Sequence, residues 1–347
     1  MKSLLNKKII IAIFLFLFSI YLYANRNVKI FPKGENLKRD INVEQISSPF
    51  KELTIPYLRN RQYNSKLGGL SLNSENVEYK SYITSYSSDG LRINGLLTIP
   101  NNNKPKNGFP AIVFVHGYIP PQQYETTKNY VDYVDYFARN NYVVFKIDLR
   151  GHGNSDGEAS GAYYSSDYVI DILNAYSALQ NSNFVDKNKI GLWGHSMAGN
   201  LVLRVLASKP TIPAVVIWAG AVYTYEDFSK YGIQDNSYHA PNSSQQRQRK
   251  RQELFDKYGQ FNKNSEFWRQ VVATNYLKDV KGAIQLNHAQ DDNVVNIGYS
   301  RDLNKILDKI NINHEFNEYS GGGHNISGLN FDKAMQNSVR FFDKYLK

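Results

Sequence analysis

The sequence of 347 residues contains no cysteine. This absence excludes disulfide bonds, thiolate zinc sites and a thiol nucleophile, and it removes the residue that carries the lipid of bacterial lipoproteins. The chain also has no HxxxH pair, no acidic cluster with metal-ligand spacing and no GxxxxGK phosphate loop. We therefore expect neither a metal ion nor another cofactor.

Acidic residues are outnumbered, with 31 Asp and Glu against 41 Lys and Arg, which gives a formal net charge of +10. The excess is spread along the chain, and only the run QQRQRKRQ at 245–252 concentrates it. No nucleic-acid-binding motif accompanies this run, so we expect no nucleic-acid partner and interpret the run as a solvated helix face. Hydrophobic residues make up 42% of the chain, which is enough for a large globular core.

The first 24 residues have the pattern of an export signal. Lys2, Lys7 and Lys8 precede an apolar run at 9–23, and Ala24 follows it. The run is shorter than the roughly 20 residues that a spanning helix prefers, which favours a signal peptide. An uncleaved N-terminal anchor is the alternative, and it would associate the chain with the membrane. In both cases we expect an exported protein that is periplasmic, secreted or anchored on the extracytoplasmic side.

The remainder of the chain divides into a polar segment and a long patterned region. Residues 25–75 are polar and Asn-rich, without a clear apolar period, and we interpret them as a lead-in that forms a linker or surface wrap. From 76 to 347 we expect one folded domain. Its first two strand-like runs, 77–85 and 91–99, flank the sequence SSDG, which predicts an antiparallel hairpin.

Strand-like and helix-like segments then alternate to the C-terminus. The apolar run AIVFVHG at 111–117 is typical of a strand buried on both faces. The alternation predicts an α/β fold with a mostly parallel sheet and helices on both faces. A stretch at about 221–282, rich in Tyr, Gln, Arg and Asn, interrupts it after a strand at 214–219. We expect this stretch to be a helical cap insertion over the ligand crevice at the C-terminal ends of the strands.

The decapeptide IGLWGHSMAG at 190–199 predicts a buried strand that turns sharply into a helix and exposes Ser196 at the turn. A serine hydroxyl is a weak nucleophile, so it must be held beside a base and near backbone N–H groups that stabilise developing charge. Gly194 and Gly199 allow the strand and the helix to approach closely. The pattern GxSxG is kept except that Ala198 replaces its second glycine. A serine that only caps the helix is the alternative interpretation.

Two later strand ends supply an acid and a base. The segment IQLNHAQDDNVV at 284–295 ends a strand in a turn with Asp291 and Asp292, and EYSGGGHNIS at 318–327 ends the next strand in a glycine-rich loop with His324. The order serine, aspartate, histidine is the one expected for hydrolases with this nucleophile turn. Each residue lies just past the C-terminal end of a strand, where open parallel sheets place their ligands.

Five segments in this order resemble the α/β-hydrolase superfamily: FVHGY, DLRGHGNSDG, GHSMAG, HAQDDNVV and GGGHN. The chain is most similar to the catalytic domain of prolyl oligopeptidase-like serine hydrolases and to the related dienelactone hydrolase and esterase group. The resemblance implies an eight-stranded sheet, with Ser196 as nucleophile and His324 as general base and then acid. It also implies Asp292 as the residue that orients the imidazole, because the family spacing HGxxDxVV fits it. Asp291 is the alternative if the turn is one residue tighter.

The resemblance further implies an oxyanion hole made by the backbone amides of Tyr118 and Met197. We accordingly predict a serine hydrolase that cleaves a carboxylic ester or a peptide or amide bond of a small substrate through an acyl-enzyme intermediate. The segment before residue 77 is too short for the propeller of full-length prolyl oligopeptidases, so peptidase action depends on the resemblance of the catalytic domain alone. The alternative is a catalytically silent hydrolase fold that binds a partner or ligand at the membrane surface.

Several other side chains have a plainer interpretation. Histidines at strand ends are expected to be structural, namely His116, His152, His195 and His288. The aromatic residues of the insertion either line an apolar substrate pocket or pack the insertion itself, namely Tyr223, Tyr225, Phe228, Tyr231 and Trp268.

Overall fold

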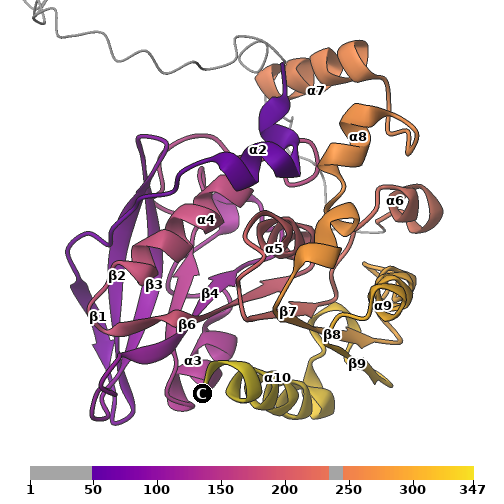
Figure 1. The fold of residues 1–347 in the computed structure, drawn as a ribbon. Coiled ribbons are helices and arrows are strands. Elements are labelled where there is room, and N and C mark those ends of the chain that lie inside the picture. The colour runs from indigo at the N-terminus through magenta and orange to yellow at the C-terminus, as the bar shows by residue number, and fades with distance from the viewer. Residues whose placement is uncertain (1–48, 234–244) are drawn as a thin grey trace, which may run out of the picture. The chain divides into compact units, whose positions relative to one another are not determined.

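The computed structural model describes residues 49–233 and 245–347. The predicted signal or anchor at 1–24, residues 25–48 of the lead-in and residues 234–244 of the insertion lie outside this part. Within the described ranges, no helix has both the length and the apolar character needed to cross a membrane. Residues 49–347 form one unit, in which helices lie on both sides of a central sheet (Figure 1).

The described residues form a sheet with the order β1-β2-β3-β5-β4-β6-β7-β8-β9. The pairs β1–β2, β2–β3 and β3–β5 are antiparallel. The remaining pairs, β5–β4, β4–β6, β6–β7, β7–β8 and β8–β9, are parallel. All seven residues of β4 are buried, as expected for a parallel strand covered on both faces. The predicted class, α/β with a mostly parallel sheet, is confirmed. The strands are β1 (Ser71–Glu75), β2 (Tyr79–Ser88), β3 (Leu91–Pro100), β4 (Phe109–Val115), β5 (Val143–Ile147), β6 (Val185–His195), β7 (Ala214–Trp218), β8 (Ala283–Ala289) and β9 (His314–Tyr319).

The sheet has nine strands in the described ranges, where the resemblance implied eight. The additional strand is β1, which lies at the edge of the sheet and pairs with β2. All five of its residues are exposed, so the sequence SLNSE has no apolar alternation that would indicate a strand. The segment is a strand because its backbone is hydrogen bonded to β2. Polar side chains are typical of an exposed edge strand, where they discourage further pairing.

The predicted hairpin is formed by β2 and β3, in which Ser88 pairs with Leu91 across the turn. The two turn residues, Asp89 and Gly90, have φ angles of 53° and 80°. Positive φ at both positions is the geometry of a tight two-residue hairpin, and Asp-Gly is a favoured sequence for it.

Helices cover both faces of the sheet (Figure 1). On one face α4, α5 and α9 bury their apolar sides in one core cluster, and on the other face α3 and α10 contribute to a second cluster. The helices are α2 (Ile55–Asn60), α3 (Val131–Arg139), α4 (Asp167–Gln180), α5 (Met197–Ser208), α6 (Glu226–Tyr231), α7 (Gln245–Tyr258), α8 (Glu266–Val271), α9 (Gly298–Ile310) and α10 (Phe331–Leu346).

The described end of the polar lead-in packs against α5. Ile55 and Leu58 of α2 are buried in the core. Arg59 donates from Nε to the Ala207 carbonyl oxygen at 2.7 Å, and the buried Arg204 donates to the Leu53 carbonyl oxygen at 3.1 Å. The segment is therefore integrated into the fold through a few apolar side chains that a mainly polar sequence does not reveal.

The insertion between β7 and β8 consists of α6, α7, α8 and a 3-10 helix, η4 (Ala273–Asp279), in its described part. Val272 has extended φ and ψ and separates α8 from η4. η4 packs against α5 and α9, while α8 contacts α2. The insertion is thus anchored to the helix that begins at Ser196.

Candidate active site

The turn that carries Ser196 joins the end of β6 to the start of α5. Ser196 has φ 56° and ψ −120°, a positive-φ conformation that is uncommon outside glycine. Its N–H donates to the Trp218 carbonyl oxygen at the end of β7, at 2.9 Å. The side chain is half-buried. The strand ladder therefore holds a strained backbone at this residue, as expected for a serine presented at a sharp strand-to-helix turn.

The glycine that precedes this turn is required by packing. A Cβ on Gly194 would lie 2.9 Å from the Ala198 carbonyl oxygen and 2.9 Å from Val202 Cγ1. Both contacts are shorter than a carbon normally tolerates, so a larger residue would force the strand and helix apart. Ala198, which replaces the second glycine of the pattern, is fully buried in the core. The departure from GxSxG is accommodated within the folded turn.

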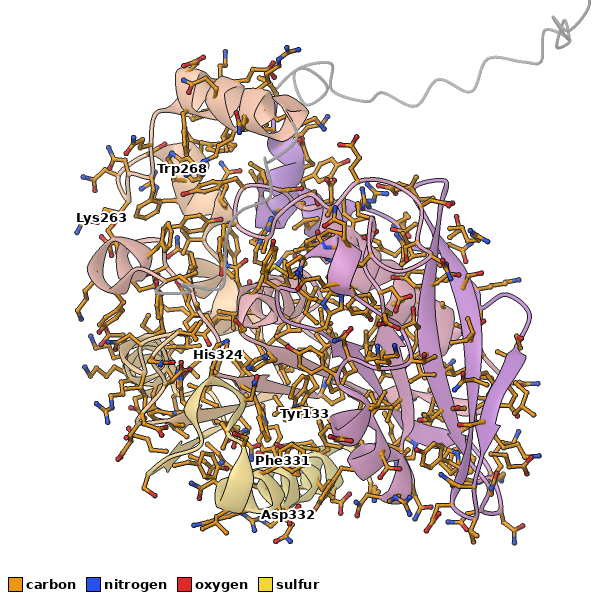
Figure 2. The ribbon with its side chains drawn as sticks, turned by 180° about the vertical axis from the view of Figure 1, so that it is seen from behind. Tyr133, Lys263, Trp268, His324, Phe331 and Asp332 are labelled. Atoms are coloured by element: carbon orange, nitrogen blue, oxygen red, sulfur yellow. The ribbon has the colours of Figure 1, made fainter. Side chains whose placement is uncertain are left out.

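The residues predicted as base and acid, His324 and Asp292, meet at the same edge of the sheet. His324 lies in the loop after β9 (Figure 2), and its Nδ1 donates to Asp292 Oδ2 at 2.8 Å. Asp292 follows β8, and its side chain is fully buried. With Nδ1 donating, the other ring nitrogen of His324 carries the lone pair, and Nε2 bonds to no described residue. This is the orientation that a general base requires.

Asp292 is held by four hydrogen bonds. Its Oδ1 accepts from the backbone N–H groups of Val294 and Val295, both at 2.9 Å. Its Oδ2 accepts from His324 and also from His288 Nε2 at 3.1 Å. Burial raises the pKa of Asp292, but the hydrogen bonds from the two histidines outweigh burial and hold the pKa well below its usual range. The carboxylate is therefore ionised and fixed in direction.

Asp291 has a different environment, although it is the neighbour of Asp292. Its carboxylate accepts from the Gly323 N–H at 2.8 Å and from the Gly322 N–H at 3.3 Å. It thus bonds to the backbone of the loop that carries His324, rather than to the imidazole. Of the two aspartates that the sequence left open, the structure brings Asp292 into contact with His324.

The serine turn and the base loop are joined by His195, the residue before Ser196. His195 Nε2 donates to the His324 carbonyl oxygen at 2.9 Å, and the two imidazole rings are 4.6 Å apart between centroids. The Ser196 hydroxyl and the His324 ring are not hydrogen bonded to each other in this structure. Their loops are nevertheless held side by side, on the edge of the sheet where β6, β8 and β9 end.

The predicted oxyanion residues lie at the ends of β4 and β6. Tyr118 follows Gly117, whose N–H donates to the Tyr130 hydroxyl at 3.0 Å and whose carbonyl oxygen lies 2.7 Å from His116 Nδ1. Because a peptide unit is planar, fixing the Gly117 carbonyl also fixes the direction of the Tyr118 N–H. Met197 is the first residue of α5, so its N–H has no acceptor within the helix and lies at the positive end of the helix dipole.

His195 and His288 were expected to be structural, with hydrogen bonds to neighbouring loops. The structure adds which loops these are: His195 contacts the loop of His324, and His288 contacts Asp292 directly. A histidine at a strand end bonds to the loop that folds beside it. The sequence therefore contained no signal that distinguishes His195 and His288 from His116 and His152. His152 bonds to the Ile119 carbonyl oxygen at 3.3 Å.

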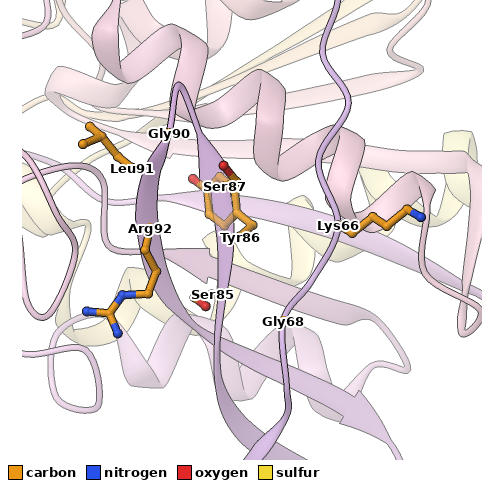
Figure 3. A pocket seen from close by; sticks show the side chains of 8 residues that line it. All are labelled: Lys66, Gly68, Ser85, Tyr86, Ser87, Gly90, Leu91 and Arg92. Carbon is orange, nitrogen blue, oxygen red and sulfur yellow. The ribbon is translucent and has the colours of Figure 1, made fainter. Parts of the chain in front are cut away.

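The aromatic residues of the insertion pack partly against one another and partly against rings outside it, namely Tyr163, Tyr164 and Tyr299. Tyr225 and Trp268 are buried, and the Trp268 ring lies 5.9 Å from Tyr225 and 6.0 Å from Phe261 between centroids. A hollow of about 590 Å³ touches this cluster along Trp268 and Phe261. A smaller hollow of about 280 Å³ lies beside the β2–β3 hairpin, between Lys66 and Arg92 (Figure 3). Trp268, one of the aromatic residues considered for a substrate pocket, lines the larger hollow, but no predicted catalytic or oxyanion residue lines either hollow.

Comparison with known proteins links this geometry to hydrolytic enzymes. A family model described as serine aminopeptidase, S33, matches residues 108–260, which is less than half of the chain. Dipeptidyl peptidase 8 of Mus musculus is 28% identical over 169 residues, which are 46% of this chain and 18% of the relative. The matched segment thus spans less than a fifth of that relative's length.

Solved structures share the fold over a larger part of the chain. An acetyl xylan esterase from Paenibacillus sp. R4 has a TM-score of 0.61 and 16% identity, and the match covers 90% of this chain and 97% of the esterase. Dipeptidyl peptidase 4 of Porphyromonas gingivalis has a TM-score of 0.56 and 18% identity, covering 78% of this chain and 36% of the peptidase. At these identities the likeness concerns the fold.

Proposed function

We propose that this chain, an α/β hydrolase by its fold, is a serine hydrolase that cleaves a carboxylic ester or a peptide or amide bond. The observation that carries the proposal is the hydrogen bond from His324 Nδ1 to the buried carboxylate of Asp292, at 2.8 Å. It fixes the imidazole in the tautomer whose Nε2 accepts a proton. Ser196, in its strained turn one residue after His195, is the nucleophile beside this base.

The proposed reaction is a two-step acyl transfer. Ser196 Oγ attacks the substrate carbonyl carbon while His324 Nε2 takes the hydroxyl proton, and Asp292 stabilises the imidazolium that forms. The amides of Tyr118 and Met197 donate to the oxyanion, and the N-terminus of α5 adds its dipole to the stabilisation. His324 then returns the proton to the leaving group. A water molecule, activated by the same imidazole, releases the acyl group from Ser196.

The test is labelling of the full chain with a fluorophosphonate, which reacts with activated serines, in the wild type and in Ser196→Ala. We expect labelling of the wild type and none of the variant. Ser208→Ala, a buried serine at the far end of α5, is the matched control and should be labelled like the wild type. A folded wild-type protein without labelling would favour the non-catalytic binding function.

A panel of p-nitrophenyl esters and aminoacyl amides decides between the two bond types. The family similarity includes peptidases and the fold similarity includes esterases, so both classes belong in the panel. Turnover of the esters alone identifies an esterase, and turnover of aminoacyl amides identifies a peptidase. Ser196→Ala measures the background for each substrate.

We also propose that the catalytic region functions outside the cytoplasm. The proposal depends on the lysines and the apolar run within residues 1–24. Fractionation of cells that express the full chain tests it, with a chain starting at residue 25 as control. Recovery of the full chain in the cytoplasmic fraction would contradict it.

A further inference from the structure

We propose that Tyr130 and His195 form a positioning bridge that holds the three loops of the active site at their working separation. The loops are the oxyanion turn at Gly117, the serine turn at Ser196 and the base loop at His324. This inference rests on the proposed serine hydrolase function, and it assigns a role in that function to two residues outside the predicted triad.

The Tyr130 hydroxyl joins the first two loops. It accepts from the Gly117 N–H at 3.0 Å and lies 2.7 Å from His195 Nδ1. Tyr130 has φ 62° at the N-terminal end of α3, a positive-φ conformation that is uncommon for a bulky residue. Such strain is usually retained at functional sites, where the surrounding structure enforces it.

His195 joins the serine turn to the base loop. The His324 carbonyl oxygen can only accept a hydrogen bond, so His195 Nε2, at 2.9 Å from it, carries the proton. His195 Nδ1 then carries the lone pair and accepts from the Tyr130 hydroxyl. Every donor in the series from Gly117 to His324 therefore faces an acceptor. The two residues form one continuous series of hydrogen bonds across the site.

The bridge is buried and keeps one protonation state. His195 is 2% exposed. Burial, together with the nearby imidazole of His324, lowers its pKa to about 3. His195 is therefore neutral at physiological pH, and its fixed tautomer keeps the same direction of donation. A neutral ring of this kind serves to position other groups, because it does not exchange protons in the working range.

The backbone at Gly117 is packed tightly against Tyr130 and His195. A Cβ on Gly117 would lie 2.7 Å from the Tyr130 hydroxyl oxygen and 3.1 Å from His195 Nδ1. One turn along α3, the Tyr133 hydroxyl donates to the Asn325 carbonyl oxygen at 3.1 Å, next to His324 (Figure 2). The first turn of α3 thus contacts the base loop directly and also through His195. A shift of α3 would displace all three loops together.

The test is Tyr130→Phe, which removes the two hydrogen bonds of the hydroxyl and keeps the ring. We expect kcat to fall about 10- to 100-fold with KM changed less than about 3-fold, because misplacement of reacting groups by a fraction of an ångström has effects of this size. The rate constant for fluorophosphonate labelling of Ser196 should fall in parallel. Tyr142→Phe is the matched control, since it removes a buried phenol that bonds to Asp343, away from the site.

His195→Gln provides an independent variant that breaks the same series. If Tyr130 and His195 act as one unit, the double variant will lose no more kcat than the worse single variant, whereas independent residues would give multiplied losses. Wild-type kcat in Tyr130→Phe overturns the proposal, as does a lower Tm with unchanged kcat per folded molecule. The proposed function is tested separately, by the loss of activity in Ser196→Ala. A failure of the bridge proposal can therefore be distinguished from a failure of the proposed function.

Discussion

The edge of the sheet that carries the candidate active site and the insertion at 221–282 are held together by different interactions. At the edge, buried polar groups are joined by directional hydrogen bonds, as in the series from Gly117 to His324 and around Asp292. In the insertion, three aromatic rings pack around Trp268 at centroid distances of 5.3 to 6.0 Å, and the buried Trp268 Nε1 bonds to no described residue. We therefore expect the activity to depend on single hydrogen-bonding atoms at the edge. In the insertion, we expect the free energy of unfolding to depend on side-chain volume.

The largest effect is expected for Asp292→Asn. The amide can no longer accept from His324 Nδ1 while keeping its other bonds, so the imidazole loses its working tautomer. We expect kcat to fall about 10³- to 10⁴-fold with little change in fold or size of the side chain. Steady-state kinetics on the ester or amide found in the panel, with circular dichroism, measure this effect.

Asp291→Asn is the control, because an amide oxygen still accepts from the Gly323 N–H. We expect a decrease in kcat of less than about 10-fold. A larger loss in Asp291→Asn than in Asp292→Asn would show that Asp291 is the acid of the site.

Trp268→Ala is the corresponding test of the insertion. Removing a fully buried indole should lower the free energy of unfolding by about 3–5 kcal/mol, through lost contacts and a cavity. The kcat per folded molecule should change by less than about threefold, because Trp268 makes no hydrogen bond to the active-site loops. Denaturant titration and active-site labelling measure the two quantities. Trp268→Phe, which keeps an aromatic ring, should retain most of the stability.

The pH dependence of the free energy of unfolding tests the burial of histidines at the hydrogen-bonded edge. Burial lowers the pKa of His195 and of His116 from 6.5 to about 3. Between these values the unfolded chain binds protons that the folded chain excludes, so stability is full above pH 6.5 and falls as the pH decreases. We expect each histidine to contribute a loss of roughly 1.4 kcal/mol per pH unit in this window. Unfolding free energies at pH 7, 6 and 5 should decline, and less steeply in His195→Gln.

The smallest effect is expected for Arg251→Gln in the basic run of α7. The guanidinium lies 4.6 Å from the centre of the Tyr164 ring and 5.3 Å from that of Phe255. Its loss should lower the free energy of unfolding by about 0.5–1 kcal/mol, as for an exposed cation over an aromatic ring. Lys250→Gln on the exposed side of the same helix should have no measurable effect. Equal effects of the two variants would show that the run is only a solvated face.

Sequence patterns predicted the elements whose burial is regular. The apolar run that became β4 and the Asp-Gly turn of the hairpin each have a local signature that tertiary packing did not change. The strained Ser196 turn was also anticipated, because Gly194 and Gly199 surround it with small residues.

Features without a local signature were missed. β1 is an edge strand with five exposed residues, of which only Leu72 is apolar, so its backbone pairing leaves no trace in the hydrophobic pattern. The start of α3 at Val131 has no local signature either, because it follows Tyr130, which adopts positive φ where its hydroxyl contacts Gly117. Contacts with distant parts of the chain decided both features, through backbone pairing for β1 and through a side-chain hydrogen bond for the start of α3.

Local periodicity and turn chemistry were enough to predict the α/β class, the order of serine, acid and histidine along the chain, and the placement of each at a strand end. Packing between distant parts of the chain was needed to select which of two adjacent aspartates contacts His324, and which histidines contact the candidate site. Adjacent residues share the same local pattern, and the direction of a side chain in a turn is set by the loops that pack against it. For Asp291 and Asp292, those partners come from residues about 30 positions further along the chain.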